Sequence, residues 1–316
     1  MMSVRTGPHG LPRILGWGAA MAGALAILTA SPALAARPSH GGGGGGGGSS
    51  STTGNDVSYP QCGGSLPSGQ AFGIVGVSDG LANTPNPCLG PSPSYPSYTE
   101  SELYWAVASS TGTTSQPKAG LYVNTADPGN GVSDWPSNND GGGTDPYGSC
   151  VPSSGNELVG VNSTACAWQY GYNKAAQDAV WLALAANATN AQGAKTTVPT
   201  SQSAYPWWLD VETTNSWQSG TSGLQMNVAD LQGMVAALSA AGVTKVGVYS
   251  TSYQWDQVTG GSKYTAGTAL VGLPDWIPGA RKLSGAVSNC QLSAFTGGGV
   301  ELTQWFSRPF DSDYAC

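Results

Sequence analysis

The stretch WWLDVETTNSWQSGTSGLQMNVADLQGMVAALSAAGVTKVGVYS, residues 207–250, contains a complete strand–helix–strand unit. Its two ends, 207–211 and 245–250, are short apolar runs that predict buried strands. Between them apolar residues recur every three or four positions from 228 to 241, which predicts an amphipathic helix. A strand, a helix and a second strand in this order are typical of a parallel βαβ unit.

The sequence predicts two long helices. We expect the helix at 228–241 to have Asn227 as its N-cap and to end at Gly242. Asparagine accepts hydrogen bonds from a first helical turn, and glycine readily adopts the left-handed conformation that ends helices. A second helical periodicity runs from Ala165 to Ala186 in steps of three and four, which predicts a helix with one apolar face.

Five further apolar runs predict buried strands. They lie at 55–59, 72–77, 119–123, 275–277 and 301–306. Near-continuous apolar runs favour a parallel sheet that is covered on both faces. Strands and helices alternating over 262 residues predict an α/β fold, a single modified (β/α) barrel of the TIM type. An open doubly wound sheet is the alternative, although no G-x-G-x-x-G motif follows the first strand.

The chain before residue 55 is not expected to join this domain. Residues 1–36 have the features of a secretory signal peptide, with an apolar run at Ile14–Leu28 and a small-x-small cleavage site at Ala33-Leu34-Ala35. Residues 37–54 contain eight consecutive glycines, which is typical of a flexible tether. We therefore expect a secreted domain at 55–316 with no membrane span after cleavage; a retained N-terminal anchor is the alternative.

Charge and composition exclude several classes of function. All 18 acidic residues but only eight of the 11 basic ones lie in 55–316, which gives this region a net charge of −10. Nucleic acids and anionic membranes are therefore poor partners. Both histidines, His9 and His40, lie outside the domain, which excludes a Ser-His-Asp triad and a His-ligated zinc. We expect a monomer without a cofactor, whose chemistry depends on carboxylates, Tyr, Lys or Cys.

The six cysteines of the domain indicate disulfide bonds, because their number is even and the chain is expected to be exported. Six cysteines allow 15 pairings, and pairing between sequence neighbours would close three local loops. The pairs favoured on this basis are Cys62–Cys88, Cys150–Cys166 and Cys290–Cys316. A four-cysteine metal site is the alternative, but no C-x-x-C spacing supports it.

Two carboxylates follow the apolar part of the strand at 207–211. Residues i and i+2 of a strand share a face, so Asp210 and Glu212 are expected to point the same way. Adjacent buried carboxylates raise the pKa of at least one of the pair, which keeps a carboxylic acid protonated near neutral pH. An acidic strand end that pairs with Lys or Asn is the alternative interpretation.

Other carboxylates fall near the ends of the chain. Asp56 lies on the first predicted strand, and Asp311 and Asp313 follow the last one. The first and last strands of a barrel are neighbours, so Asp56, Asp210, Glu212 and Asp311 are expected to converge on one acidic pocket. Clustered carboxylates indicate glycoside hydrolysis or calcium binding. Because no D-x-D-x-D-G loop is present, we expect no metal site.

Trp and Tyr are abundant in the domain, which contains ten of the 11 Trp and all 13 Tyr. These side chains offer flat apolar faces with a polar group, which suits stacking on sugar rings. Tyr249, Trp276 and Trp305 lie at predicted strand ends and are candidate substrate-binding residues. Packing in the core is the alternative for each ring.

Several of these motifs occur together in one known family. They are DVSY at 56–59, WLDVE at 208–212, VYST at 248–251, and LTQWF followed by FDSDY at 302–314. In this combination the chain resembles glycoside hydrolase family 25, the lysozyme-type muramidases, over most of 55–316. The resemblance implies a barrel of five β/α units and three closing strands.

The resemblance also implies an activity and site residues. The activity is hydrolysis of the β-1,4 bond between N-acetylmuramic acid and N-acetylglucosamine in peptidoglycan. Glu212 matches the general acid/base, and Asp210 matches the carboxylate that supports the N-acetyl group or the developing oxocarbenium ion. Asp56 and Asp311 match flanking acidic residues. The late motifs add Gln304 and Asp313 to Tyr249, Trp276 and Trp305 as expected substrate-binding residues.

The chain departs from the family's pattern in regions that shape sugar subsites. Its third strand reads LYVN at 121–124 where a Tyr-His pair is usual, and Asp79-Gly80 replaces an acidic E-G. Two Gly/Pro/Ser-rich loops, 79–98 and 127–164, are longer than expected; they either rim the active-site face or are surface insertions. A non-catalytic glycan-binding protein and a glycosidase for another polysaccharide are therefore the alternatives.

Overall fold

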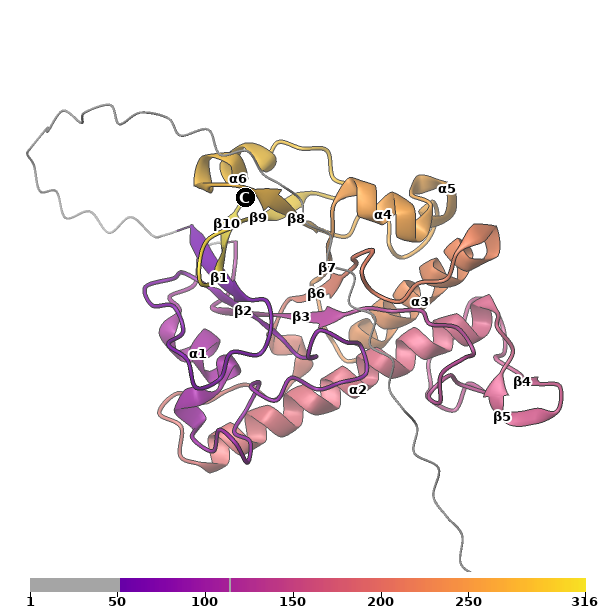
Figure 1. Ribbon diagram of the computed structural model, residues 1–316, viewed down its shortest axis with the longest axis horizontal. Coiled ribbons are helices and arrows are strands. Elements are labelled where there is room, and N and C mark those ends of the chain that lie inside the picture. Colours follow the sequence, from indigo (N-terminus) through magenta and orange to yellow (C-terminus); the bar gives the residue numbers. More distant parts are fainter. Residues whose placement is uncertain (1–51, 114) are drawn as a thin grey trace, which may run out of the picture. The chain divides into compact units, whose positions relative to one another are not determined.

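Eight strands close into a barrel in the computed structural model, which describes residues 52–113 and 115–316 (Figure 1). The expected signal peptide and nearly all of the expected tether lie outside the described residues. The strands are β1 (Thr53–Val57), β2 (Gly73–Gly76), β3 (Ala119–Asn124), β6 (Trp207–Asp210), β7 (Val246–Tyr249), β8 (Asp275–Ala280), β9 (Val300–Trp305) and β10 (Asp311–Ala315). Their order around the barrel is β1-β10-β9-β8-β7-β6-β3-β2.

The barrel is mixed rather than wholly parallel. Strand β10 is antiparallel to both β9 and β1, and every other neighbouring pair is parallel. The α/β barrel expected from the sequence is confirmed, but β10 was missed, since Asp311 and Asp313 were expected beyond the last strand. Acidic residues are depleted from strands in general, so the sequence DSDYA carries no strand signal. Strand β1 also begins two residues earlier than expected, at Thr53.

Six α-helices surround the barrel in the described residues (Figure 1). They are α1 (Glu102–Ser109), α2 (Thr164–Ala191), α3 (Gly220–Ala240), α4 (Ser252–Thr259), α5 (Ser262–Thr265) and α6 (Leu283–Asn289), with 3-10 turns at Tyr98–Glu100 and Gln202–Ala204. Helices follow β2, β3, β6, β7 and β8, which makes five β/α units, and β1, β9 and β10 complete the barrel. None of these described helices combines the length and apolar character needed to cross a bilayer.

Helices α2 and α3 lie side by side, and glycines allow their close approach (Figure 1). A Cβ atom on Gly171 would lie 2.0 Å from the Asp230 carbonyl oxygen, and one on Gly233 would lie 1.9 Å from the Trp168 carbonyl oxygen. Both distances are far shorter than van der Waals contact. The two glycines therefore fix how closely these helices pack.

The start of α3 differs from the sequence-based expectation. The helix begins at Gly220 after the N-cap Ser219, so Asn227 lies inside it rather than at its start. The Asn227 side chain is fully buried; its Nδ2 donates to the carbonyl oxygens of Gln218 (3.0 Å) and Val258 (2.8 Å). The apolar periodicity missed the first two turns because they are polar and glycine-rich. Gly242 follows the helix with φ +83°, as expected for a stop.

Side chains of β6 alternate between two apolar layers. Trp207 and Leu209 belong to the core between the sheet and the helices, whereas Trp208 packs inside the barrel against Trp276, with ring centroids 5.8 Å apart. Asp210 follows Trp208 by two residues and therefore also points inward. On the neighbouring strand β7, Gly247 leaves room for the Trp208 ring, since a Cβ there would lie 2.3 Å from Trp208 Cζ3.

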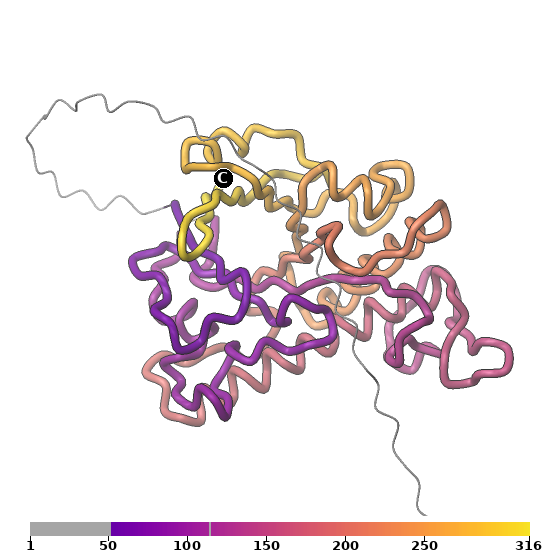
Figure 2. Tube along the Cα trace, viewed as in Figure 1, coloured from indigo at the N-terminus to yellow at the C-terminus, as the bar shows by residue number. Residues whose placement is uncertain are grey.

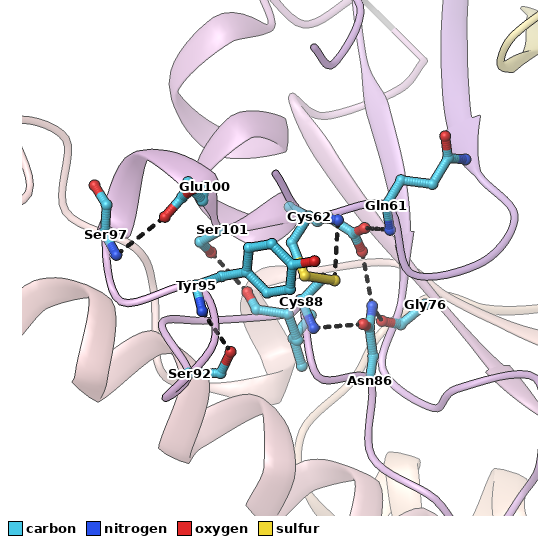
Figure 3. The surroundings of a disulfide bond; sticks show 12 residues. Gln61, Cys62, Gly76, Asn86, Cys88, Ser92, Tyr95, Ser97, Glu100 and Ser101 are labelled. Atoms are coloured by element: carbon cyan, nitrogen blue, oxygen red, sulfur yellow. Dashed lines mark hydrogen bonds between the residues drawn. A yellow bond between two sulfur atoms is a disulfide. The ribbon is translucent and has the colours of Figure 1, made fainter. Parts of the chain in front are cut away.

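All six cysteines are paired, in the three pairs expected from the sequence: Cys62–Cys88, Cys150–Cys166 and Cys290–Cys316. The first joins the β1–β2 loop to the β2–α1 loop (Figure 3). Beside it, Asn86 Nδ2 donates to the Gly76 carbonyl oxygen at 2.8 Å, and Asn86 Oδ1 accepts from the Cys88 amide at 2.8 Å. These contacts anchor the β2–α1 loop at the carboxyl end of β2.

A buried carboxyl completes this junction. Glu102, the first residue of α1, is fully buried and accepts hydrogen bonds from the Gln61 amide (2.6 Å) and from Asn86 Nδ2 (2.7 Å). Burial raises the pKa of Glu102 from 4.5 to about 7, and its hydrogen bonds lower it only in part. Ionisation of Glu102 therefore opposes folding.

We predict that replacing Gly247 with alanine lowers the free energy of unfolding by about 1–3 kcal/mol, the usual cost of overpacking a core. Denaturant unfolding measures this change. The control is Gly299→Ala, because no atom lies within 4 Å of a Cβ at Gly299 and its φ is not positive. Equal stability of the two variants would show that Trp208 does not need the space at Gly247.

We also predict that the protein is most stable in acid. The folded state holds the Glu102 proton more tightly than the unfolded chain, so stability is fully present below about pH 4.5 and is lost as the pH rises through about 7. The loss from this residue is on the order of 3 kcal/mol. Urea unfolding between these pH values measures it in the parent protein and in Glu102→Gln. The variant should show a shallower pH slope, whereas the exposed control Glu157→Gln should keep the parent slope.

Candidate active site

A cavity of about 110 Å³ opens at the mouth of the barrel, at the carboxyl ends of the parallel strands. It contains all four carboxylates expected to be catalytic and three of the five residues expected to bind substrate. Its lining residues are Asp56, Ser58, Tyr122, Asp210, Glu212, Tyr249, Trp276, Gln304 and Asp311. They come from β1, β3, β6, β7, β8, β9, β10 and the turns that follow β1 and β6, so closure of the barrel is what assembles the cavity.

Asp210 is the last residue of β6 and is buried. Asn124 Nδ2, at the end of the adjacent strand β3, donates to Asp210 Oδ2 at 2.7 Å, and Asp210 Oδ1 has no partner among the described residues. Burial, and secondly the charge of Glu212, raises the pKa of Asp210 well above its ordinary value. Its surroundings therefore favour the protonated carboxyl, which can donate a hydrogen bond, more than water does.

Glu212 stands two residues beyond Asp210, in the turn after β6, and is half-buried. Burial raises its pKa, and a hydrogen bond with Gln254 partly offsets the rise. The backbone here is held in place because Trp217 Nε1 donates to the Glu212 carbonyl oxygen at 2.8 Å. Glu212 thus combines a raised pKa with access to water, which are the properties needed for repeated proton transfer.

Asp56 faces these residues from β1 and is held by two donors. Ser58 Oγ donates to Asp56 Oδ1 at 2.8 Å, and Gln304 Nε2 donates to Asp56 Oδ2 at 2.9 Å. Tyr249 OH donates to Gln304 Oε1 at 3.1 Å, which fixes the orientation of the Gln304 amide. Burial raises the pKa of Asp56 to about 6, so Asp56 is ionised at neutral pH. Ser58 Oγ also lies 3.4 Å from Asp311 Oδ2 and links the two carboxylates.

Two residues expected to bind substrate do not line the cavity. Trp305 is adjacent to Gln304 on β9, and successive strand residues point to opposite faces, so the indole lies outside the barrel. Asp313 is fully buried beneath the cavity, where Trp276 Nε1 donates to Asp313 Oδ1 at 2.9 Å. Its carboxyl also lies against Asp56, and burial followed by the Asp56 charge raises the Asp313 pKa well above its ordinary value. Asp313 therefore positions Trp276 and can donate its proton to Asp56.

Three residues at the site were not expected from the sequence: Ser58, Tyr122 and Asn124. The period of two along a strand could have found them. Ser58 follows Asp56 by two residues, and Tyr122 and Asn124 occupy the inward positions of LYVN. Tyr122 OH donates to the Val57 carbonyl oxygen at 3.2 Å and so ties β3 to β1 across the barrel interior.

Three exposed aromatic rings follow strands that end at the mouth. Tyr59, Tyr253 and Phe306 follow β1, β7 and β9, and their exposed fractions are 60%, 70% and 62%. Their positions after parallel strands place them on the same side as the carboxylates. No three His, Cys, Asp or Glu side chains within 52–113 and 115–316 are arranged to hold a metal ion.

One protein family is similar to part of this chain. A family model described as lysozyme-like protein 1 matches residues 200–271. The matched segment spans β6, α3, β7, α4 and α5, and it contains Asp210 and Glu212. No curated protein and no solved structure gives a significant match. The part of the chain that is similar to this family therefore includes the strand–helix–strand unit that carries Asp210 and Glu212.

Proposed function

We propose that the protein is a secreted glycoside hydrolase that cleaves a cell-wall glycan, most directly the β-1,4 bond of peptidoglycan. The observation that carries this proposal is the cavity in which Asp210 and Glu212 meet Asp56 and Asp311 at the barrel mouth. The lysozyme-like segment at 200–271 and the resemblance of the motifs to glycoside hydrolase family 25 support the same activity.

In this proposal Glu212 is the general acid and base. It gives its proton to the glycosidic oxygen as the bond from that oxygen to the anomeric carbon breaks. It then takes a proton from the water that adds to the anomeric carbon, so the enzyme returns to its starting state. The half-buried position of Glu212 allows both transfers.

Asp210 and Asp56 have different surroundings and therefore different roles. Burial favours the protonated form of Asp210, and its unpartnered Oδ1 is free to bind the N-acetyl group of the sugar. Asp56, with a pKa of about 6, supplies negative charge that stabilises the developing oxocarbenium ion. Environments that separate the pKa values of neighbouring carboxyl groups are what assign acid and base roles.

The surroundings of the cavity suit a neutral sugar polymer. Inside it, Trp276 and Tyr249 present an aromatic pair with ring centroids 4.6 Å apart. Outside it, the exposed rings of Tyr59, Tyr253 and Phe306 offer further stacking surfaces along a glycan strand. A strand longer than one sugar can therefore lie across the mouth.

We predict that Glu212→Gln retains the fold and loses more than about a hundredfold in rate, the effect of removing general acid catalysis. The assay is the release of new reducing ends from insoluble peptidoglycan by the oxidised protein. Glu157→Gln is the matched control and should keep the parent rate; Glu157 is an exposed residue of β5 (Asn156–Gly160), which pairs with β4 (Pro152–Ser153) in a two-stranded sheet outside the barrel. Full turnover by Glu212→Gln would overturn the assignment. Pelleting of both proteins without release would instead indicate a glycan-binding protein.

We predict a bell-shaped pH profile with a mildly acidic maximum. Activity should fall at low pH as Asp56 is protonated through its pKa of about 6, and at high pH as Glu212 loses its proton. Gln304→Leu removes a hydrogen bond that favours ionised Asp56, so the acid limb of kcat/KM should move to higher pH. An unchanged acid limb in Gln304→Leu would exclude Asp56 as the group that controls it.

A further inference from the structure

A second cavity, of about 180 Å³, lies between loops on the same side of the barrel as the catalytic cavity. Its walls come from residues 80–83 after β2, 125–132 after β3 and 215–216 after β6, together with Tyr170 of α2. Two of these segments belong to the long loops that distinguish this chain. Figure 2 shows how the chain leaves the barrel at these loops and folds against the first turns of α2.

This cavity adjoins the catalytic carboxylates through the backbone of Asp210. Thr125 Oγ1 donates to the Asp210 carbonyl oxygen at 2.6 Å, and Asn215 Nδ2 donates to the same oxygen at 3.2 Å. Both side chains also line the second cavity. A ligand in this cavity would therefore be separated from Asp210 by one layer of side chains. At that separation it could be part of the same glycan strand as the sugar in the catalytic cavity.

The walls are held together by contacts between the loops. Tyr170 OH donates to Asn83 Oδ1 at 3.2 Å, and the Tyr170 ring stacks on Trp135 with centroids 5.4 Å apart. The Asp127 amide donates to the Ser216 carbonyl oxygen at 2.9 Å. The cavity thus exists before a ligand arrives, which reduces the entropy lost on binding.

The lining is uncharged, in contrast to the acidic catalytic cavity. Amide and hydroxyl groups come from Asn83, Thr125 and Asn215, and small apolar surfaces come from Ala82, Ala126 and Val132. Such a lining suits a neutral ligand that carries hydroxyl groups, an amide and a methyl group. It offers no charged partner to the carboxylates and amines of a peptide.

The volume indicates that one unit of a longer ligand fits here. Pockets that hold a whole drug-sized molecule measure roughly 300–1,000 Å³, which is larger than the cavity of about 180 Å³. We propose that this cavity is a subsite for an N-acetylated sugar of the glycan strand whose cleaved bond lies over Asp210 and Glu212. This inference rests on the proposed function and names a specificity element within it.

The test uses Glu212→Gln, which binds without turning over, and the neutral hexamer of N-acetylglucosamine as the probe. Methyl resonances of Leu81, Ala126 and Val132 should shift on titration together with signals from the catalytic cavity. In the same background, Ala126→Phe fills the cavity and should weaken hexamer binding about tenfold, equivalent to about 1.4 kcal/mol. Its parent-like spectrum without ligand serves as the folding check.

A second pair of variants tests the subsite without relying on Ala126→Phe. Leu81 and Leu158 are both exposed leucines, at 66% and 84%, but only Leu81 lines the cavity. Leu81→Asp should weaken hexamer binding and Leu158→Asp should not. Shifts confined to the catalytic cavity, with equal affinities for all variants, would refute the subsite while leaving the proposed function intact. No shift at either cavity would overturn the subsite, and the reducing-end assay separately decides the hydrolase.

Discussion

The site depends on the alternation of side chains along β6, a short strand that is buried on both faces. Trp207 and Leu209 point outward and pack against the helices, so Trp208 and Asp210 must point into the barrel. The Trp208 ring fills the interior below the mouth, and Gly247 on the next strand makes room for it. If the register of β6 shifted by one residue, the carboxyl of Asp210 would lie in the apolar core. Trp207 and Leu209 would then point into the barrel.

Burial then gives the carboxyl groups different properties. Burial raises the pKa of Asp210 and Asp313 well above the ordinary value and that of Asp56 to about 6, whereas Glu212 lies between the cavity and water. The side chains that contact Asp210 and Asp56 are amides, from Asn124 and Gln304 respectively. Because these pKa values are raised in the folded state, the cluster of acids lowers the free energy of unfolding at higher pH. The raised pKa of Glu102 has the same effect.

The sequence predicted elements whose signals are local. The unit from β6 to β7 and the disulfide pairs depend on short-range periodicity or short loops, and the structure contains them. The five β/α units were implied by the family resemblance and are also present. The sequence failed where partners far away in the chain decide the outcome. Strand β10 forms because β1, which lies far from it in the chain, and β9, which precedes it across a turn, pair with it on both sides. The early start of α3 was missed for a local reason, since its first turns are polar and glycine-rich.

At the site, too, some features could be predicted from local sequence signals and others depended on the three-dimensional arrangement. The convergence of Asp56, Asp210, Glu212 and Asp311 could be expected from strand ends, whereas the outward direction of Trp305 required the register of β9. The second cavity could not be expected at all, because three loops from different units must meet to form it.

The most direct measurement of the central claim is hydrolysis of peptidoglycan in water enriched in oxygen-18, followed by mass spectrometry of the soluble fragments. If Glu212 activates water at an anomeric carbon, each new reducing end carries one labelled oxygen, on the N-acetylmuramic acid side of the broken β-1,4 bond. Fragments whose label lies in the peptide, or fragments without label, would contradict the account.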